Sequence, residues 1–204
     1  MKHTFNGWEN IESFDLNKVV DLVLTNGTPK SIKPDMWIPP MIGAIEQSLS
    51  ILDFGCGVGR NIFEYSRKYK NWIFYGYDNS QMLDKANEYS STVFNKQSHE
   101  YSNIQFIPDW EMLKHIQFDC IYATIVFQHI TENNLIKYLN DIKNMTSKLI
   151  VAGRRFNDDI NIDGTYKNTW KIMENCGFYP SNAAEINYNV DGNPEDHNTC
   201  IYEW

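Results

Sequence analysis

Short runs of consecutive apolar residues alternate along this chain with longer stretches in which apolar residues recur every three or four positions. The runs expected to contain strands lie at 51–54, 72–78, 103–107, 118–130 and 148–152. Nearly continuous apolar runs are typical of strands that are buried on both faces of a parallel sheet. Their alternation with amphipathic stretches predicts an α/β domain.

Helices are expected where a capping residue opens an amphipathic stretch or a glycine closes it. They lie at 16–26, 41–48, from residue 60, from residue 79, at 131–145 and at 166–176. Asp15 and Thr131 are the expected N-caps of two of them, and Gly177 ends the last. Residues 28–40, which include Pro39-Pro40, are expected to form a loop.

The last part of the sequence contains two further candidate strands, at 184–190 and 197–203. Apolar and polar residues alternate in the second of these, which indicates a half-buried edge. We divide the chain into an N-terminal helical cap segment, residues 1–48, and a core, residues 49–204, that together form one domain.

Residues 53–61, Asp-Phe-Gly-Cys-Gly-Val-Gly-Arg-Asn, join the first strand to the helix that follows. Glycine takes a positive φ without steric cost and lets the backbone approach a ligand closely. The N-terminus of the next helix offers N–H groups and the positive end of the helix dipole. The pattern predicts a site for a ligand of nucleotide size, and a glycine-rich turn without a ligand is the alternative.

Two features separate this loop from the dinucleotide fingerprint G-x-G-x-x-G. Arg60 stands where the third glycine is required, and Gly59 comes one residue early. Asp53, two residues before the first glycine, would repel a pyrophosphate. The stretch from Asp53 to Gly59 resembles the D-x-G-x-G-x-G motif of class I S-adenosylmethionine-dependent methyltransferases. The resemblance implies a cofactor with an ammonium, a sulfonium and no phosphate.

The resemblance covers about 49–204 and implies a Rossmann-like, seven-stranded, mostly parallel sheet. It further implies the strand order 3-2-1-4-5-7-6, flanking helices and a C-terminal antiparallel hairpin. The resemblance implies that the Asp78 carboxylate holds the cofactor ribose and that Met82 packs on the adenine. Asp109 and Trp110 match the positions that bind the adenine amino group and cover its ring. The alternatives are helix caps at both acids and a core tryptophan.

The set of cofactor-binding residues that follows from the resemblance is Asp53, Gly55, Cys56, Gly57, Asn61, Asp78, Asn79, Met82, Asp109, Trp110, Ala123 and Thr124. The last two belong to residues 118–130, which resemble the family segment that carries the fourth strand and ends in x-H-(apolar). The resemblance places Phe127, Gln128 and His129 beside the methyl group. An imidazole there can act as a general base, and a purely structural histidine is the alternative.

Three further residues are candidates for binding the acceptor. Arg154, after the fifth strand, can clamp a carboxylate or phosphate, with a solvated loop charge as the alternative. Tyr166 is expected at the start of a helix, from which it can reach a pocket. Trp37 belongs to an N-terminal segment that either covers the cofactor as a lid or packs against the core.

Composition restricts the partners further. A formal net charge of −8 argues against a duplex nucleic-acid binder, which needs a basic face. No apolar run is long enough to cross a bilayer, the start of the sequence lacks the apolar core of a signal peptide, and the four cysteines show no C-x-x-C spacing. We therefore expect a cytoplasmic protein with reduced thiols and no metal site. No pattern indicates an oligomeric state.

The prediction from sequence is a methyltransferase that uses S-adenosyl-L-methionine to methylate a nitrogen or oxygen of a small molecule. The alternatives are an RNA or protein methyltransferase and a non-catalytic protein that binds the same cofactor. An adenine methyltransferase is disfavoured because Val126, Phe127, Gln128 and His129 stand where a D/N-P-P-Y-like motif is expected. An NAD-dependent oxidoreductase is disfavoured by Arg60.

Overall fold

The computed structural model describes residues 13–24, 38–43, 46–93, 102–153, 159–160, 166–167, 169–181, 186–188 and 197–204. The chain divides into two compact units, one ending at Trp110 and the other beginning at Glu111. No helix in these described ranges has the length and apolarity needed to cross a membrane.

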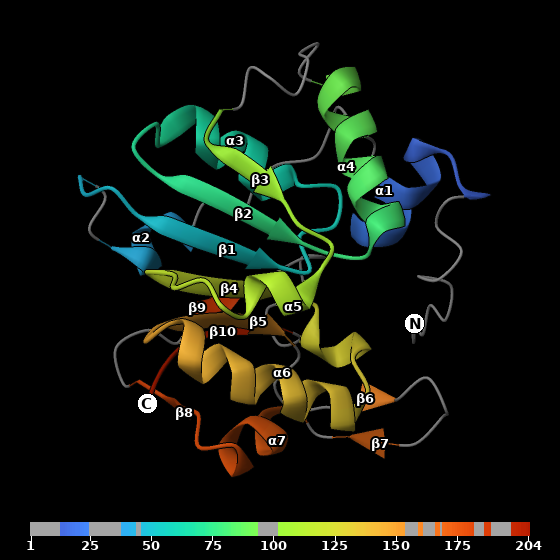
Figure 1. Cartoon of the computed structure of the whole chain (residues 1–204). Helices are drawn as coiled ribbons and strands as arrows, with labels where there is room; N and C mark the ends of the chain where they lie inside the picture. The colour runs from blue at the N-terminus through green and yellow to red at the C-terminus, as the bar shows by residue number, and fades with distance from the viewer. Residues whose placement is uncertain are drawn as a thin grey trace. The chain divides into compact units, whose positions relative to one another are not determined.

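The first unit is built on three parallel strands, β1 (Ser50–Phe54), β2 (Ile73–Tyr77) and β3 (Ile104–Phe106). Helices α3 (Arg60–Lys68) and α4 (Ser80–Val93) follow β1 and β2, as the apolar pattern predicts (Figure 1). In the register of β1 and β2, Asp53 lies opposite Gly76 and Phe54 lies opposite Tyr77. The ends of the two strands, where the candidate site residues follow, are therefore level.

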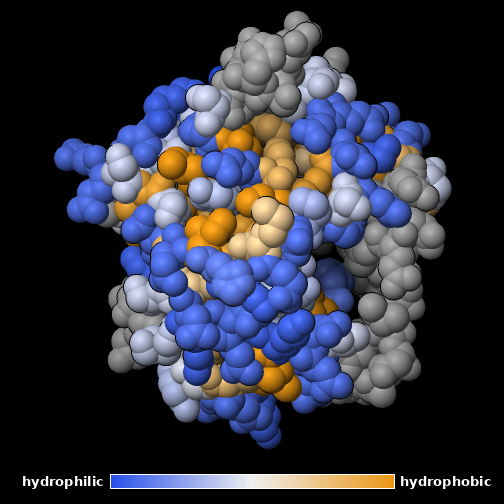
Figure 2. All heavy atoms as spheres, viewed as in Figure 1, coloured by the Kyte–Doolittle hydropathy of each residue, from blue (hydrophilic) through white to orange (hydrophobic). Residues whose placement is uncertain are grey.

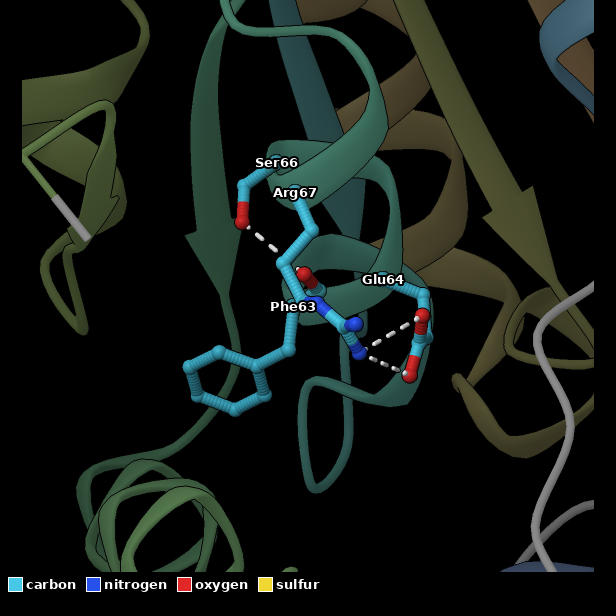
Figure 3. Close-up of polar contacts among 4 residues, drawn as sticks. All are labelled: Phe63, Glu64, Ser66 and Arg67. Atoms are coloured by element: carbon cyan, nitrogen blue, oxygen red, sulfur yellow. Dashed lines mark hydrogen bonds and ion pairs between the residues drawn. The ribbon is translucent and has the colours of Figure 1, made fainter. Parts of the chain in front are cut away.

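Helix α3 separates its polar and apolar positions around its axis. Figure 3 shows the Phe63 ring pointing away from Glu64 and Arg67, whose side chains form an ion pair with an N–O distance of 3.3 Å. Phe63 is buried, and its ring packs against Phe106 of β3 with centroids 5.7 Å apart. A Cβ on Gly76 would lie 2.5 Å from the Phe106 ring, so glycine in β2 allows this close packing.

Two helices precede β1. In α1 (Leu16–Leu24), the expected N-cap is confirmed, because the Lys18 N–H donates to the Asp15 carboxylate at 2.8 Å. Helix α2 is Ile38–Ile42 rather than 41–48, so that prediction was wrong in its bounds. Its two prolines fall in the first turn, where the missing N–H groups have no helical partner to lose.

Helix α1 is part of the core of the first unit. Val19 and Val20 are fully buried and belong to the same apolar cluster as Val58, Met82 and Tyr89. The division into a cap segment and a separate core therefore stays a prediction, and in this structure α1 packs on the residues that surround the glycine loop.

The boundary between the two units falls in α5 (Trp110–Leu113). Trp110 is the last residue of the first unit, and the rest of α5 belongs to the second. Strands β4 (Cys120–Thr124) and β5 (Leu149–Gly153) are parallel, and β10 (His197–Glu203) is antiparallel to β5. The 3₁₀ turn η3 (Phe127–His129) follows β4, and α6 (Glu132–Met145) precedes β5. Thr131 is the N-cap of α6 as expected, but its hydroxyl makes no capping bond.

The part of the surface that α6 forms in Figure 2 is largely hydrophilic. The exposed positions of this helix include Glu132, Lys137 and Asn140. Leu135 and Leu139 are buried on the other side of the helix. The 3.6-residue period that predicted this helix therefore matches its burial.

The C-terminal strands differ from the prediction in detail. Strands β8 (Tyr179–Pro180) and β9 (Ile186–Tyr188) both pair with β10; β9 lies within the strand expected at 184–190, and β8 was not predicted. The hydrogen-bonded order β3-β2-β1-β4-β5-β10-β8 confirms the predicted order 3-2-1-4-5-7-6. In this comparison β10 corresponds to strand 7 of the predicted order and β8 corresponds to strand 6.

The helix expected at 166–176 is shorter than predicted. Tyr166–Lys167 form β7, which pairs with β6 (Asp159–Ile160), and α7 is Thr169–Asn175. An antiparallel partner satisfies the backbone of Tyr166, and an aromatic residue suits a strand. The position of Tyr166 at a helix start was therefore wrong.

Candidate active site

The glycine loop between β1 and α3 needs glycine at three positions. Gly55, Gly57 and Gly59 have φ of 73°, 56° and 73°, which other residues rarely adopt. Gly59 is also the N-cap of α3. A Cβ on Gly59 would lie 2.9 Å from the Phe63 ring, so this glycine also allows the helix to pack closely. The same Cβ would lie 3.2 Å from the Phe106 ring of β3, so glycine here leaves room for both rings.

The loop is fastened to the end of β2 by its own amides. The N–H groups of Gly55 and Cys56 both donate to the Tyr77 carbonyl, at 2.8 and 3.0 Å. The Gly57 N–H donates to Asp78 Oδ2 at 2.9 Å. These three donors are therefore used inside the protein. A pyrophosphate cradle would need donors of this kind to point at the ligand.

Asp78 faces the loop, and the residue after it caps the helix. Asp78 Oδ1 accepts the Asn79 N–H at 2.8 Å, while Asn79 Oδ1 accepts the Met82 N–H at 2.9 Å. Asn79 is thus the N-cap of α4. The alternative interpretation of Asp78 as a simple helix cap was wrong, and its carboxylate is aimed at the glycine loop.

Burial raises the pKa of Asp78 from its ordinary value of 3.8 to about 6, although the amides of Gly57 and Asn79 act in the opposite direction. The pKa of the Cys56 thiol is raised by burial and then by the charges of Asp78 and Asp53. Two carboxylates therefore act on the middle of the loop. This field favours a cation there and disfavours a phosphate.

Three aromatic rings lie together at the ends of β1 and β2. Trp110 is buried, with its ring centroid 5.3 Å from that of Phe54 at an angle of 84°, and 5.1 Å from that of Tyr77. Sequence reasoning selected Trp110 and missed Tyr77, which stands next to Asp78 and is half-buried. An aromatic residue directly before the acid was the available signal. Asp109 is exposed.

Two further predicted residues of the first unit are buried. Asn61 in α3 is 4% exposed. Met82 is 2% exposed and packs in the apolar cluster with α1. Their contacts to a cofactor stay predictions.

The stretch after β4, residues 124–129, which we call the post-β4 turn, has unusual geometry. Ile125 has a φ of 59°, which is a strained value for a β-branched residue. Its N–H donates to the Ala152 carbonyl of β5 at 2.7 Å, which holds the backbone in place. Phe127 is buried, while Gln128 and His129 are half-buried.

Two side-chain oxygens of this turn, Thr124 Oγ1 and Gln128 Oε1, are buried and have no hydrogen-bond partner among the described residues. The amide nitrogen of Gln128 lies 3.4 Å from Nε2 of His129. Buried polar atoms without partners are uncommon in folded proteins and call for an explanation. Ala123, at the end of β4, is buried.

The described residues thus place the predicted positions in two groups. Asp53 to Trp110 lie in the first unit and Ala123 to His129 in the second. Trp37 and Arg154 lie outside the described residues, and of Tyr166 only the backbone in β7 is described. Within the described ranges, no group of three histidine, cysteine, aspartate or glutamate residues could hold a metal ion.

The first unit can hold a hydroxylated ligand at Asp78 and a positive charge near Asp53 and Asp78. Its loop amides are already used, so it suits a ligand without a pyrophosphate. The post-β4 turn offers buried oxygen acceptors and an imidazole. The residues of the first unit by themselves fit a positively charged adenosine derivative.

Comparisons with known proteins give a family-model match to part of the chain and a shared fold. Residues 51–148 match the family model described as a methyltransferase domain. A search of curated proteins finds no match. A SAM-dependent methyltransferase from Aquifex aeolicus is 17% identical with a TM-score of 0.59, covering 93% of this chain and 98% of that one.

Magnesium protoporphyrin IX methyltransferase from Synechocystis PCC 6803, solved with bound SAM, is 14% identical with a TM-score of 0.57, covering 100% of this chain and 85% of that one. An O-methyltransferase family 2 protein from Planctomyces limnophilus, in complex with apigenin, is 11% identical with a TM-score of 0.57, covering 79% of this chain and 52% of that one. This chain therefore spans about half the length of the latter protein. At these identities the structures show a shared fold.

Proposed function

We propose that this chain is a class I S-adenosylmethionine-dependent methyltransferase that methylates an oxygen or a nitrogen of a small-molecule acceptor. The assignment of the cofactor site depends on one observation: the N–H groups of Gly57 and Asn79 donate to the Asp78 carboxylate and hold it beside the glycine loop. A carboxylate fixed in this way has lone pairs left for ribose hydroxyls.

The residues of the first unit divide the work of holding the cofactor. Asp78 accepts hydrogen bonds from the ribose, and the field of Asp53 and Asp78 attracts the ammonium and sulfonium charges. Trp110 and Asp109 are assigned to the adenine. This set fits S-adenosylmethionine better than NAD, because Gly55, Cys56 and Gly57 use their amides on Tyr77 and Asp78.

S-adenosylmethionine, when bound, supplies a methyl group that is already activated by its sulfonium. The protein therefore has to position the reactants and keep the site dry. Ala123 and Thr124 are assigned to the methionine end of the cofactor, and Phe127 supplies a buried apolar wall. His129 takes the proton from the oxygen or nitrogen of the acceptor as that atom is methylated.

A small-molecule acceptor is supported by charge and by comparison. The net charge of −8 disfavours a polyanionic acceptor such as RNA. The similar protein from Planctomyces limnophilus holds apigenin, a small hydroxylated molecule. Trp37, Arg154 and Tyr166 are proposed to line the acceptor side. A cytoplasmic location is proposed from the sequence, and the inert, buried Cys120 thiol, whose pKa burial raises to about 12, is consistent with it.

Calorimetry with S-adenosylhomocysteine and with NAD tests the cofactor assignment. We expect binding of S-adenosylhomocysteine and none of NAD. Asp78→Asn should weaken binding about tenfold or more, because a hydrogen bond to a charged group contributes about 1.5–3 kcal/mol. Asp84→Asn, the same change at an exposed position of α4, should leave affinity unchanged. Binding of NAD alone would overturn the assignment.

The role of His129 is tested by separating binding from turnover. His129→Ala should retain affinity for S-adenosylhomocysteine and lose about 100-fold or more in kcat, a typical contribution of general acid–base catalysis. His115→Ala removes an exposed imidazole of the same unit and should behave like wild type. A His129→Ala variant with unchanged kcat and an unchanged pH profile would show that His129 is structural.

A further inference from the structure

The side chain of Gln128 uses only one of its two ends. Its nitrogen lies 3.4 Å from Nε2 of His129, and its oxygen is buried with no partner among the described residues. A primary amide offers two donors and two acceptor lone pairs, and a buried carbonyl oxygen left unpaired is costly. The turn therefore has a buried hydrogen-bond acceptor for which the described residues offer no partner.

The backbone at the same place is strained as well. Ile125 adopts a φ of 59°, a conformation that is unfavourable for a β-branched residue. The contact of its amide with Ala152 ties this strained residue to β5. Strain of this kind persists where the surrounding structure fixes it, and it concentrates at functional sites. An unpaired buried oxygen at Gln128 and a strained backbone at Ile125 thus lie within four residues of each other.

Strand β6 lies beside the turn. Its backbone, Asp159–Ile160, is close to η3 within the second unit, and it pairs with β7. Because the Gln128 amide lies next to the His129 ring, a reactant held at this imidazole is also close to the side chain of Gln128.

We propose that Gln128 is an acceptor-recognition and positioning residue: its Oε1 receives a hydrogen bond from an O–H or N–H of the acceptor, and its nitrogen orients His129. This proposal rests on the function proposed above and narrows the acceptor to molecules that donate a hydrogen bond beside the methylated atom, such as vicinal diols, catechols and aminoalcohols. Molecules whose neighbouring oxygen or nitrogen is fully alkylated are excluded.

The contact with His129 gives Gln128 its second task. The contact places the Gln128 amide against Nε2 of His129, with donor and acceptor roles that depend on the tautomer of the ring. It limits the rotation of the imidazole, so Gln128 positions the ring that takes the proton from the acceptor.

Thr124 provides a contrast within the same turn. Its hydroxyl oxygen is also buried and unpaired among the described residues. We assign it to the cofactor side, where the resemblance places it. Thr124→Val should therefore weaken S-adenosylhomocysteine binding, and Gln128→Met should leave it unchanged.

The first test needs no knowledge of the acceptor. Gln128→Met keeps the length of the side chain and removes the unpaired oxygen, so it should raise the melting temperature by about 2–4 °C. Gln117→Met, at an exposed position of the same unit, should not raise it. A Gln128→Met variant that melts at or below the wild-type temperature would overturn the proposal, because the oxygen would then carry no stored cost.

The second test uses pairs of acceptors. Labelled S-adenosylmethionine is offered with catechol and 2-methoxyphenol, and with 2-aminophenol and 2-(dimethylamino)phenol. We expect wild type to prefer the donor-bearing member of each pair by about tenfold or more in kcat/KM, and Gln128→Met to lose the preference while Gln128→Glu keeps part of it. Equal use of both members, or the same preference in Gln128→Met, would refute the inference.

The two proposals fail differently. If wild type does not bind S-adenosylhomocysteine, the proposed function fails. If it binds but Gln128→Met is not stabilised, only the role of Gln128 fails. If no compound of the panel is methylated, the melting temperature decides alone.

Discussion

The affinity for the cofactor should depend on pH through the ionisation of Asp78. As pH falls, affinity should decrease while the contribution of this group to the free energy of unfolding increases, whereas general acid denaturation would lower both. Burial raises the pKa of its carboxyl to about 6 from an ordinary value of 3.8. The ionised carboxylate has lone pairs on both oxygens for the ribose hydroxyls beside the amides of Gly57 and Asn79, and protonation of one oxygen removes part of this capacity. With a pKa of about 6, roughly 90% of the protein is ionised at pH 7 and roughly 10% at pH 5. Binding should therefore weaken about tenfold between these values.

The stability of the free protein should move the other way. Because the folded state holds this proton more tightly than the unfolded state, the contribution of Asp78 to stability is present at low pH and is lost as pH rises through about 6. The difference between the two pKa values corresponds to at most about 3 kcal/mol, and solvent at the half-buried carboxylate reduces it. Acid should thus weaken ligand binding while this one group makes the fold more stable.

The assay is titration calorimetry with S-adenosylhomocysteine from pH 5 to pH 7.5, together with denaturant unfolding of the free protein. Asp78→Asn keeps a side-chain oxygen for the Gly57 N–H and cannot titrate, so it is the matched control. Its affinity should be lower at pH 7 and flat across the range. The stability of wild type relative to this variant should rise as pH falls. A flat wild-type affinity, or an equal slope in Asp78→Asn, would refute the reasoning.

Three further predictions concern the scaffold, and each is checked by denaturant unfolding. Gly59→Ala should destabilise the protein by about 2–3 kcal/mol, because the new Cβ meets Phe63 at 2.9 Å and the residue keeps a φ of 73°; an unchanged midpoint would show that the loop can relax. Ile125→Asn should stabilise it by up to about 1 kcal/mol, because asparagine tolerates the left-handed region, and a loss of stability would mean that Ile125 packing outweighs its strain. Val19→Ala should cost about 2 kcal/mol because Val19 is fully buried, whereas the exposed Asn17→Ala should cost almost nothing; equal effects would contradict the placement of α1 in the core.

Local features of the sequence were sufficient for most of the sheet. Consecutive apolar residues predicted β1, β2 and β5 to within about two residues at each end and located β4 within the longer run 118–130. Runs of this kind are typical of strands in a parallel sheet whose faces are covered. The glycine loop was also predictable, since positive φ at three alternating positions demands glycine. The strand order came with the resemblance that this loop carries.

Helix and strand ends depended on partners that sequence does not show. Pro39 and Pro40 fall inside α2, because proline is tolerated in a first helical turn once the chain before it has the right direction. Tyr166 lies in a strand, β7, because Asp159–Ile160 pairs with it in the antiparallel sense. Within the strand expected at 184–190 the structure describes β9, and the short β8, which pairs with the end of β10, was not predicted.

The sequence by itself determined that an acid, a glycine loop and a second acid would meet at the ends of neighbouring strands, because parallel strands end at a common edge. Only the tertiary structure decided that Asn79, rather than Asp78, caps α4, and that three loop amides bind the protein itself. It also decided that the Gln128 oxygen is buried without a partner among the described residues. Hydrogen-bond partners are distant in sequence and compete for the same atoms, so only the folded chain settles which pairs form.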